Sequence, residues 1–325
     1  MAATVEDYVL AADRENTVRS YASAIKNFEE VWKGLLPTTG DTVARYLVEH
    51  ATAYRLSTLR LHLAALARWH ADNGFADPTR SPLVHKVLRG IKAKHASPQR
   101  RARPLQLEVL ESVSDALSAS QSAARDVGRQ TDVMRAGRDR ALVLLGFWRA
   151  FRSDELANMR IEEIEAVRGQ GLTCRPGRTK TTDEEEDKAF HCPALSRLCP
   201  VDAYLDWIAL SGRKSGPVFP ALDRWGNLSN EHMTTQSILP LLRRILQAAG
   251  AAEAKSYSSH SLRRGFAGWA SANGWDLKEL MEHVGWRDVN SALRYIDVSS
   301  DRLKSKFERG LSRRSVPGEG AADRG

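Results

Sequence analysis

Apolar side chains recur at three- and four-residue steps through the first hundred residues, and this spacing limits the fold more than any other feature of the chain. One face of an α-helix carries residues at such steps, so each run predicts an amphipathic helix with a buried stripe. Three runs share the spacing: Val18, Tyr21, Ile25, Phe28 and Trp32; Val43, Tyr46 and Leu47; and Leu59, Leu63, Leu66 and Trp69. We predict a helical bundle whose aromatic side chains lie mostly in its core.

Helix start signals separate these runs. Ser, Thr, Asn and Asp side chains accept the open N–H groups of a first turn, and Pro suits the first helical position. The expected starts are Asn16 and Thr17, then Thr39 to Asp41, then Ser57, and finally Ser81 with Pro82 for a fourth helix that reaches about Ile91. The 325 residues suffice for two domains. We predict a helical domain over 1–103, a second domain over 104–312, and a disordered tail over 313–325, which contains Pro, Gly and Arg.

The cysteine content excludes some kinds of site. The chain has three cysteines, Cys174, Cys192 and Cys199, and they show no close paired spacing. An odd number without such pairs argues against a disulfide framework, and His191 beside Cys192 lacks a fourth well-spaced ligand for zinc. We expect no metal site. No signal peptide opens the sequence, and no apolar run approaches the roughly 18 residues of a membrane span, so we expect an intracellular protein without a membrane partner.

The last third of the chain combines a cationic cluster with a hydroxyl group. His260 and Arg263 are three residues apart, so a helix would place both on one face. Trp286 follows Arg263 by 23 residues, and Tyr295 follows Trp286 by nine. A phenol with a pKa of about 10 becomes a useful nucleophile when cations stabilise the electrophile and a base is within reach. Arginine can hold two phosphate oxygens at once. The pattern indicates a phosphate clamp beside a nucleophile.

Each of these residues also has a plainer interpretation. Taken singly, His260 is more often a structural or capping residue, and Trp286 and Tyr295 are more often core aromatics. Their order and spacing constrain one another, which favours a site. His283 lies near this segment but at a different offset from Tyr295, and we interpret it as a neighbour.

A second arginine occupies a predicted helix junction upstream. A buried apolar helix runs to Trp148, and Ser153 to Leu156 start the next helix with capping residues ahead of an apolar stripe. Arg152 lies at this junction, and Glu155 follows it by three residues. Arg149 is a competing candidate, but it lies on the preceding helix.

These segments resemble the catalytic half of the tyrosine recombinases, the phage-integrase family. Arg152 matches the family's first catalytic arginine, and Glu155 matches the acidic residue that braces the site. Most members carry a second histidine where this chain has Trp286, which makes the segment most similar to the Cre recombinase branch. An indole N–H can donate to a phosphate oxygen, but it cannot carry a proton away.

The resemblance also implies a lysine in the loop of a small sheet. Lys180 is the candidate, Arg178 is close by, and Phe190 to Pro193 would form the returning strand. The acidic run 183–187 between them is interpreted as a solvated hairpin tip, or alternatively as a charge that holds the Lys180 loop away from the phosphate until DNA docks. The implied fold is mainly α with a small β-sheet, in which a helical core-binding domain precedes an α+β catalytic domain.

The resemblance implies a complete reaction. Arg152 and Arg263 neutralise the scissile phosphate, Trp286 adds a donor, and His260 organises the phosphate and is the candidate acceptor of the Tyr295 proton. Tyr295 forms a 3′-phosphotyrosyl bond, and Lys180 protonates the departing 5′ hydroxyl. No divalent ion, ATP or other cofactor is implied.

The partner that the resemblance implies would be a double-stranded DNA recombination site. Strand exchange would pass through a Holliday junction in a tetramer assembled through a short amphipathic helix over 301–311, in the cytoplasm with the nucleoid.

The charge distribution agrees with a DNA partner. The formal net charge is +8, and residues 1–103 account for +6 of it. Eight basic residues and no acidic one lie between Arg80 and Arg103. We interpret the end of this stretch as a linker along the DNA backbone, or alternatively as a plain flexible connector. The expected DNA-binding residues of the stretch are Lys86, Arg89, Lys92, Lys94, Arg100, Arg101 and Arg103.

Two other functions remain open. A type IB topoisomerase-like enzyme shares the tyrosine and the clamp, but it relaxes supercoils as a monomer. A non-catalytic DNA-binding protein could keep the fold. The helical first domain and the segment 301–311 favour a recombinase over the first, and the intact Arg152, His260, Arg263 and Tyr295 argue against the second.

Overall fold

The computed structural model describes residues 4, 15–95, 102–175, 189–293 and 308. The chain divides into two compact units, one within the first hundred residues and the other from residue 101 onward. Each unit is treated by itself below. Within the described part of the chain, no helix is both long and apolar enough to cross a membrane.

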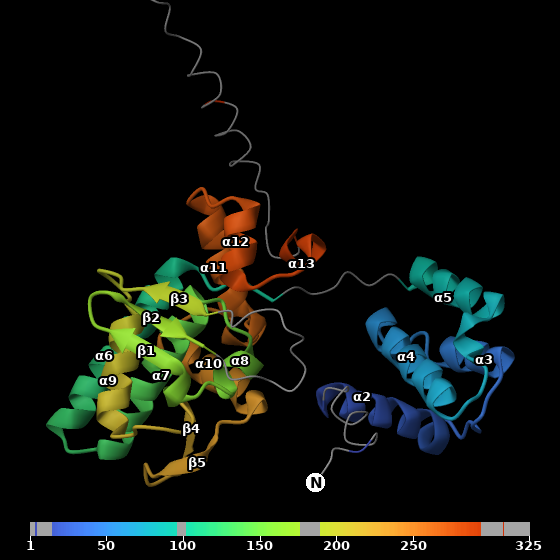
Figure 1. Ribbon diagram of the computed structural model, residues 1–325, viewed down its shortest axis with the longest axis horizontal. Helices are drawn as coiled ribbons and strands as arrows, with labels where there is room; N and C mark the ends of the chain where they lie inside the picture. The colour runs from blue at the N-terminus through green and yellow to red at the C-terminus, as the bar shows by residue number, and fades with distance from the viewer. Residues whose placement is uncertain (1–3, 5–14, 96–101, 176–188, 294–307, 309–325) are drawn as a thin grey trace, which may run out of the picture. The chain divides into compact units, whose positions relative to one another are not determined.

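The N-terminal unit is a helical bundle, as the spacing predicts. Its elements are α2 (Glu15–Lys26), the π-helical η1 (Asn27–Val31), α3 (Gly40–Glu49), α4 (Leu56–Asp72), the 3-10 helix η2 (Pro78–Arg80) and α5 (Pro82–Lys94) (Figure 1). One apolar cluster holds the bundle together, and Phe28, Tyr46, Leu47 and Leu59 are fully buried in it. Burial of large apolar side chains such as these is the main stabilising contribution to the unit.

Several details of the first predicted helix are wrong. Val18 is 52% exposed and therefore does not belong to the buried stripe. The α-helix gives way to a π-helical turn at Asn27, and Trp32 lies just past its end. The turn widens where the Asn27 amide donates to Tyr54 Oη at 2.9 Å and accepts from Tyr46 Oη at 2.7 Å. These bonds tie the turn to other parts of the bundle, which local spacing does not reveal.

Two helix boundaries also differ from the prediction. Ser57 does not cap the third helix, because the carbonyl of Arg55 already accepts from the N–H groups of Thr58 and Leu59. The fourth helix starts after Ser81 as predicted but continues to Lys94, beyond Ile91. Basic residues in its last turn favour this extension, since cations stabilise the negative end of a helix.

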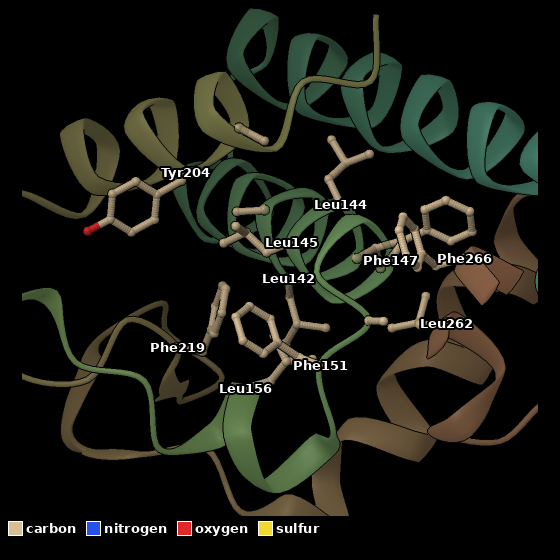
Figure 2. Packing of buried hydrophobic residues seen from close by; sticks show 14 of the residues in the cluster. Leu142, Leu144, Leu145, Phe147, Phe151, Leu156, Tyr204, Phe219, Leu262 and Phe266 are labelled. Carbon is tan, nitrogen blue, oxygen red and sulfur yellow. The ribbon is translucent and has the colours of Figure 1, made fainter. Parts of the chain in front are cut away.

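The second unit is built around one buried helix. Its helices are α6 (Leu107–Asp126), α7 (Gln130–Trp148), α8 (Ser153–Ala157), η3 (Ile161–Glu163), α9 (Pro200–Ser211), α10 (Thr235–Ala248), η4 (Ala254–Ser256), α11 (His260–Ala272), α12 (Leu277–Val284) and α13 (Val289–Leu293). The central helix α7 packs against α6, α9, α10 and α11. Figure 2 shows apolar side chains leaving it on several sides, and Phe147 meets Phe266 of α11 edge to face at 6.2 Å.

Two small antiparallel sheets complete this unit. The first has the order β1 (Ile164–Val167), β2 (Gly171–Cys174) and β3 (Phe190–Pro193), and it packs on α9 (Figure 1). Leu172 pairs with Cys192 in its register. The second pairs β4 (Pro220–Leu222) with β5 (Leu228–His232). The mainly helical fold with a small sheet is confirmed, and the predicted return strand is β3. Lys180, Arg178 and the acidic run lie outside the described residues.

Candidate functional site

The junction between α7 and α8 presents Arg152 at the surface. The α-helix α7 ends at Trp148, so Arg149 is its C-cap residue rather than a helical residue as the sequence suggests. Ala150 follows with a positive φ of 52° and is fully buried. Arg152 then occupies the N-cap position of α8 in an extended conformation, with its side chain 49% exposed. The reversal at Ala150 therefore separates a buried helix end from an exposed cation.

Glu155 connects two arginines. Its Oε1 accepts from Arg152 Nη1 at 2.6 Å, and its Oε2 accepts from the Arg152 backbone N–H at 2.7 Å. The same Oε2 lies 3.9 Å from Arg263 Nη1. One carboxylate thus holds Arg152 in place and offsets part of the repulsion between two nearby guanidinium groups.

Arg263 is almost completely buried on α11, with 1% exposure. Its Nη1 donates to the carbonyl of Ala150 at 2.8 Å, and its Nη2 donates to the carbonyl of Val284 at 3.3 Å. Its guanidinium lies 5.1 Å from the centre of the Trp286 ring. These contacts orient the guanidinium before any substrate arrives, which is what electrostatic stabilisation of a transition state requires.

His260 is the first residue of the same helix, one turn before Arg263. Its backbone N–H donates to Ser258 Oγ at 3.2 Å, and its side chain remains accessible to solvent. Partial burial of the ring, and then the positive charges of Arg263, Arg152 and Arg264, lower the pKa of His260 below its ordinary value. The neutral imidazole is therefore favoured near neutral pH, and it carries a lone pair that can accept a proton.

Close packing fixes this end of α11 in the core. A Cβ on Gly265 would lie 2.0 Å from the carbonyl oxygen of Leu105, so only glycine fits there. Leu105 in turn donates its N–H to the carbonyl of Ser261 at 3.0 Å. The segment leading into α6 therefore lies directly on the helix that carries His260 and Arg263.

Trp286 is positioned by the end of α12. Asp276 and Glu279 form a reciprocal cap at the start of this helix, each accepting the other's N–H at 2.8 Å. Gly285 ends the helix with a φ of 70°, a conformation that glycine adopts at little cost. The backbone N–H of Trp286 then donates to the carbonyl of Met281 at 2.9 Å. The indole is 6% exposed and faces Arg263.

The contacts thus bring Arg152, Glu155, Arg263 and Trp286 together, with His260 one turn away. Lys180 and Tyr295 lie outside the described residues, and so do Arg100 and Arg101. The remaining expected DNA-binding residues are divided between the two units. Exposed side chains on α5 of the first unit belong to Lys86, Arg89, Lys92 and Lys94.

Arg103 belongs to the second unit by its contacts. Its Nη1 lies 3.6 Å from Glu253 Oε2, and its guanidinium lies 5.4 Å from the centre of the Tyr257 ring. Its backbone N–H also donates to the carbonyl of Ser256. The basic stretch expected from the sequence is therefore partly helix α5 of the first unit, and its last residue, Arg103, is held in the second unit.

Two residues near the site have contacts that the sequence did not suggest. Arg149 Nη1 donates to the backbone carbonyl of His283, and His283 Nε2 donates to the carbonyl of Trp148 at 2.7 Å. From the sequence alone, Arg149 is only an alternative to Arg152 as the site arginine, and His283 is only a neighbour of the site. No local pattern links residues that are 134 positions apart, so only the tertiary structure reveals the pair.

In the part of the chain that the structure describes, no group of three His, Cys, Asp or Glu side chains could hold a metal ion. The three cysteines are buried free thiols. Burial raises the pKa of Cys174 to about 11 and that of Cys192 to about 12, so both thiols stay protonated and unreactive at neutral pH.

A helical unit that presents two braced arginines, an imidazole and an indole has the equipment of an enzyme that handles phosphodiesters. The phage integrase family model matches residues 129–302, which is more than half of the chain. The chain therefore belongs to the phage integrase family, and it is a tyrosine-type site-specific recombinase or integrase that acts on DNA.

Relatives extend the similarity beyond the matched segment. The chain is 24% identical over 292 residues to the integrase/recombinase xerD homolog of Selenomonas ruminantium, covering 87% of this chain and 82% of that protein. It is 25% identical over 297 residues to the recombinase cre of Escherichia phage P1, covering 86% and 80%. Both relatives therefore include a counterpart of the N-terminal unit.

Solved structures share the fold. A XerH site-specific recombinase bound to a palindromic difH substrate matches with a TM-score of 0.61 at 17% identity, covering 91% of this chain and 79% of that one. A lambda integrase dimer bound to a COC′ core site matches with a TM-score of 0.56 at 17% identity, covering 89% and 92%. At these identities the likeness supports the fold alone.

Proposed function

We propose that this recombinase cleaves and rejoins DNA through a 3′-phosphotyrosyl bond at Tyr295. The observation that carries the proposal is the braced pair of Arg152 and Arg263, held by Glu155 with Trp286 alongside. Two oriented guanidinium groups stabilise the charge that develops on a phosphate during displacement. His260 is the acceptor of the Tyr295 proton, and Lys180 is the acid that protonates the departing 5′ hydroxyl.

The proposed chemistry retains the energy of the phosphodiester bond in a covalent intermediate. The phosphodiester bond becomes a phosphotyrosyl ester, and the departing strand keeps its 5′ hydroxyl. Attack by the 5′ hydroxyl of the partner strand reverses the step and releases the tyrosine. Two such exchanges pass through a Holliday junction and recombine two sites. Because the bond energy is retained in the ester, religation needs no ATP.

Trp286 makes the proposed mechanism similar to that of the Cre branch. An indole N–H donates a hydrogen bond but exchanges no proton, so His260 and Lys180 carry all proton transfers in this scheme. The buried indole over Arg263 supports a second contribution, because its ring face favours the guanidinium.

The proposed domains follow from the helical bundle and the matched family segment. A core-binding domain covers 1–103, a catalytic domain covers 104–312, and a tail covers 313–325. The contacts of Arg103 favour a boundary a few residues earlier. Exposed cations on α5 supply phosphate contacts from the first domain.

Because the substrate is DNA, we propose that the protein acts in the cytoplasm, in association with the nucleoid.

The direct test uses the DNA that the protein binds in cells. That site, cloned in two copies on one supercoiled plasmid, is expected to undergo exchange with purified protein. Relaxation of the plasmid without exchange would support a topoisomerase-like enzyme. Binding with neither relaxation nor exchange would support a non-catalytic DNA-binding protein.

Chelation should leave cleavage intact. Two arginines take the part that a metal ion plays in other phosphoryl-transfer enzymes, so no divalent ion is needed to offset the developing charge. We expect wild-type adduct formation on a nicked duplex in EDTA without ATP. A loss that magnesium reverses would contradict the metal-free mechanism.

Neutralising the basic segment should weaken all DNA binding alike. We expect the triple variant Arg100→Gln, Arg101→Gln and Arg103→Gln to flatten the dependence of log affinity on log salt. The slope should fall by roughly one unit for each phosphate that an arginine no longer neutralises. Arg160→Gln is the control for loss of a surface arginine outside this segment, because its pair with Glu162 at 2.6 Å is closer than the 3.6 Å pair of Arg103 with Glu253. An unchanged slope in the triple variant would mean that the segment is only a tether.

The segment after the nucleophile is proposed to join subunits into a tetramer. Leu303, Phe307 and Leu311 would form one stripe on a helix too short to be stable alone in water. Deleting 301–325 should leave single-site binding nearly unchanged and abolish recombination between two sites. Wild-type recombination by the truncated chain would refute this assembly, and so would collapse of the isolated monomer.

A further inference from the structure

Arg149 is a buried cation that the phosphate clamp does not use. It is 4% exposed, and burial lowers the pKa of its guanidinium to about 10. Burying a charge is costly unless it is well paired, and an apolar side chain of similar volume often stabilises a fold better. The presence of an arginine here therefore calls for an explanation other than stability.

The first contact of Arg149 closes the end of another helix. Its Nη1 donates to the carbonyl of His283 in the last turn of α12, where helix carbonyls lack helical partners. His283 Nε2 donates in the opposite direction, to the carbonyl of Trp148 in the last turn of α7. At the end of each helix, a backbone carbonyl therefore accepts a hydrogen bond from a side chain at the end of the other helix.

The surroundings of His283 hold it in this role. Its ring stacks on Phe266 with the ring centres 4.8 Å apart, and it meets the edge of Trp275 at 5.2 Å. Burial, and then the charge of Arg149, lower the pKa of His283 to about 4, while its bond to Trp148 opposes the shift. The ring is therefore neutral near pH 7, with its N–H directed at α7.

The second contact of Arg149 reaches the small sheet. Its guanidinium lies 4.7 Å from the centre of the Phe190 ring and 5.7 Å from that of Phe151. Phe190 is the first residue of β3, and a Cβ on Gly285 would lie 3.9 Å from its Cε1 atom. Phe190 therefore contacts the cation and lies beside the turn that precedes Trp286, and a cation favours an aromatic face.

Arg149 thus contacts three segments that carry site residues. Arg152 follows it by three residues, Trp286 follows His283 by three, and Lys180 precedes β3 in the sequence. We propose that Arg149, acting with His283, is a positioning residue that fixes the Gly285–Trp286 turn against the phosphate clamp. The proposal rests on the proposed function for its catalytic consequence, but not for its geometry.

A second buried arginine, within helix α7 itself, provides a contrast. Arg138 is 5% exposed, and its Nε and Nη2 both bond Asp139 Oδ1, at 3.0 and 2.7 Å. Its guanidinium therefore has a buried carboxylate partner, which Arg244 also contacts through Oδ2 at 2.7 Å. Arg149 Nε is buried without a hydrogen-bond acceptor among the described residues. Its guanidinium contacts the His283 carbonyl and two rings, and the charge of Glu155 acts on it without a hydrogen bond. Arg138→Met is therefore the matched control for Arg149→Met.

Amide hydrogen exchange of the full chain without DNA tests the geometry. The amides of Gly285 and Trp286 bond the carbonyls of Glu282 and Met281. In Arg149→Met we expect both to exchange about tenfold faster, since local opening controls exchange. Arg138→Met should leave them unchanged, and Arg149→Lys should give a smaller effect. If Arg149→Met does not fold, His283→Phe keeps the stacked ring, removes the donor and should speed the same amides.

Single-turnover adduct formation tests the consequence, on a nicked duplex carrying the DNA site recovered from cells. Arg149→Met should slow cleavage by about 10- to 100-fold, because small displacements of catalytic groups have effects of this size. When Arg149→Met is added to Trp286→Phe, we expect the cleavage rate to fall by less than about a further threefold, since the effects of coupled residues are not additive. DNA affinity should remain within about twofold of wild type, whereas a merely structural defect would lower binding as well.

The two tests separate the inference from the proposed function. Unchanged exchange at Gly285 and Trp286, or fully additive losses in the double variant, would overturn the positioning role. Absence of any adduct with the wild-type chain would overturn the proposed function, and the exchange data would still decide the geometry.

Discussion

Tyr295→Phe is expected to bind its DNA site with wild-type affinity and to form no covalent adduct. The change removes one hydroxyl oxygen, the only atom that could attack phosphorus in the proposed mechanism. The braced clamp of Arg152 and Arg263 does not depend on that oxygen, so phosphate binding should persist. A nicked duplex traps the covalent product, and denaturing gel electrophoresis after a single turnover measures it.

A conservative aromatic change elsewhere controls for altered packing. Tyr204→Phe removes a hydroxyl from a buried tyrosine on α9, which is outside the clamp, and should cleave like wild type. If Tyr295→Phe still formed an adduct, the attacking residue would be another one. If it lost DNA binding, the tyrosine would serve the fold or the interface rather than the chemistry.

Sequence periodicity predicted the helical elements because one-sided burial leaves a local signature. The helix α7 ends at Trp148 and α8 begins at Ser153 as predicted, although Arg152 rather than Ser153 occupies the N-cap position and Glu155 accepts its backbone N–H. Boundaries failed where backbone hydrogen bonds or distant partners took over. Ser57 was not the cap because Arg55 already started the helix, and Asn27 opened a π-turn to reach two tyrosines.

For the site as well, the sequence predicts which residues take part but not how the fold orients them. Residue types and spacing selected His260, Arg263 and Trp286 as candidates, and the family resemblance added Arg152 and Glu155. The structure places all five around one cluster of contacts. Spacing did not reveal that Arg263 is held by the carbonyls of Ala150 and Val284. It also did not reveal the exchange between Arg149 and His283, because backbone carbonyls are chemically alike at every position. Candidates come from side-chain chemistry, whereas their orientation comes from the fold.

Arg263→Lys should slow cleavage by on the order of 10²- to 10³-fold, the usual loss when one oriented donor to a developing oxyanion is removed. Lysine keeps the charge, but its single ammonium group cannot reach the carbonyls of Ala150 and Val284 and also present a second N–H to phosphate. The contact with the Trp286 ring weakens for the same reason. The deficit should appear in the single-turnover rate, with DNA affinity nearly unchanged.

Arg243→Lys distinguishes loss of the clamp from loss of a structural bridge. Arg243 also joins two backbone carbonyls, since its Nε donates to Tyr257 at 3.1 Å and its Nη2 to Lys255 at 3.0 Å. It contacts none of the clamp residues through these bonds, so its replacement should lower the melting temperature and leave the cleavage rate within about threefold of wild type. Equal rate losses in the two variants would mean that Arg263 acts through the fold. A large loss confined to Arg263→Lys would mean that the orientation of this guanidinium, and not its charge alone, accelerates the reaction.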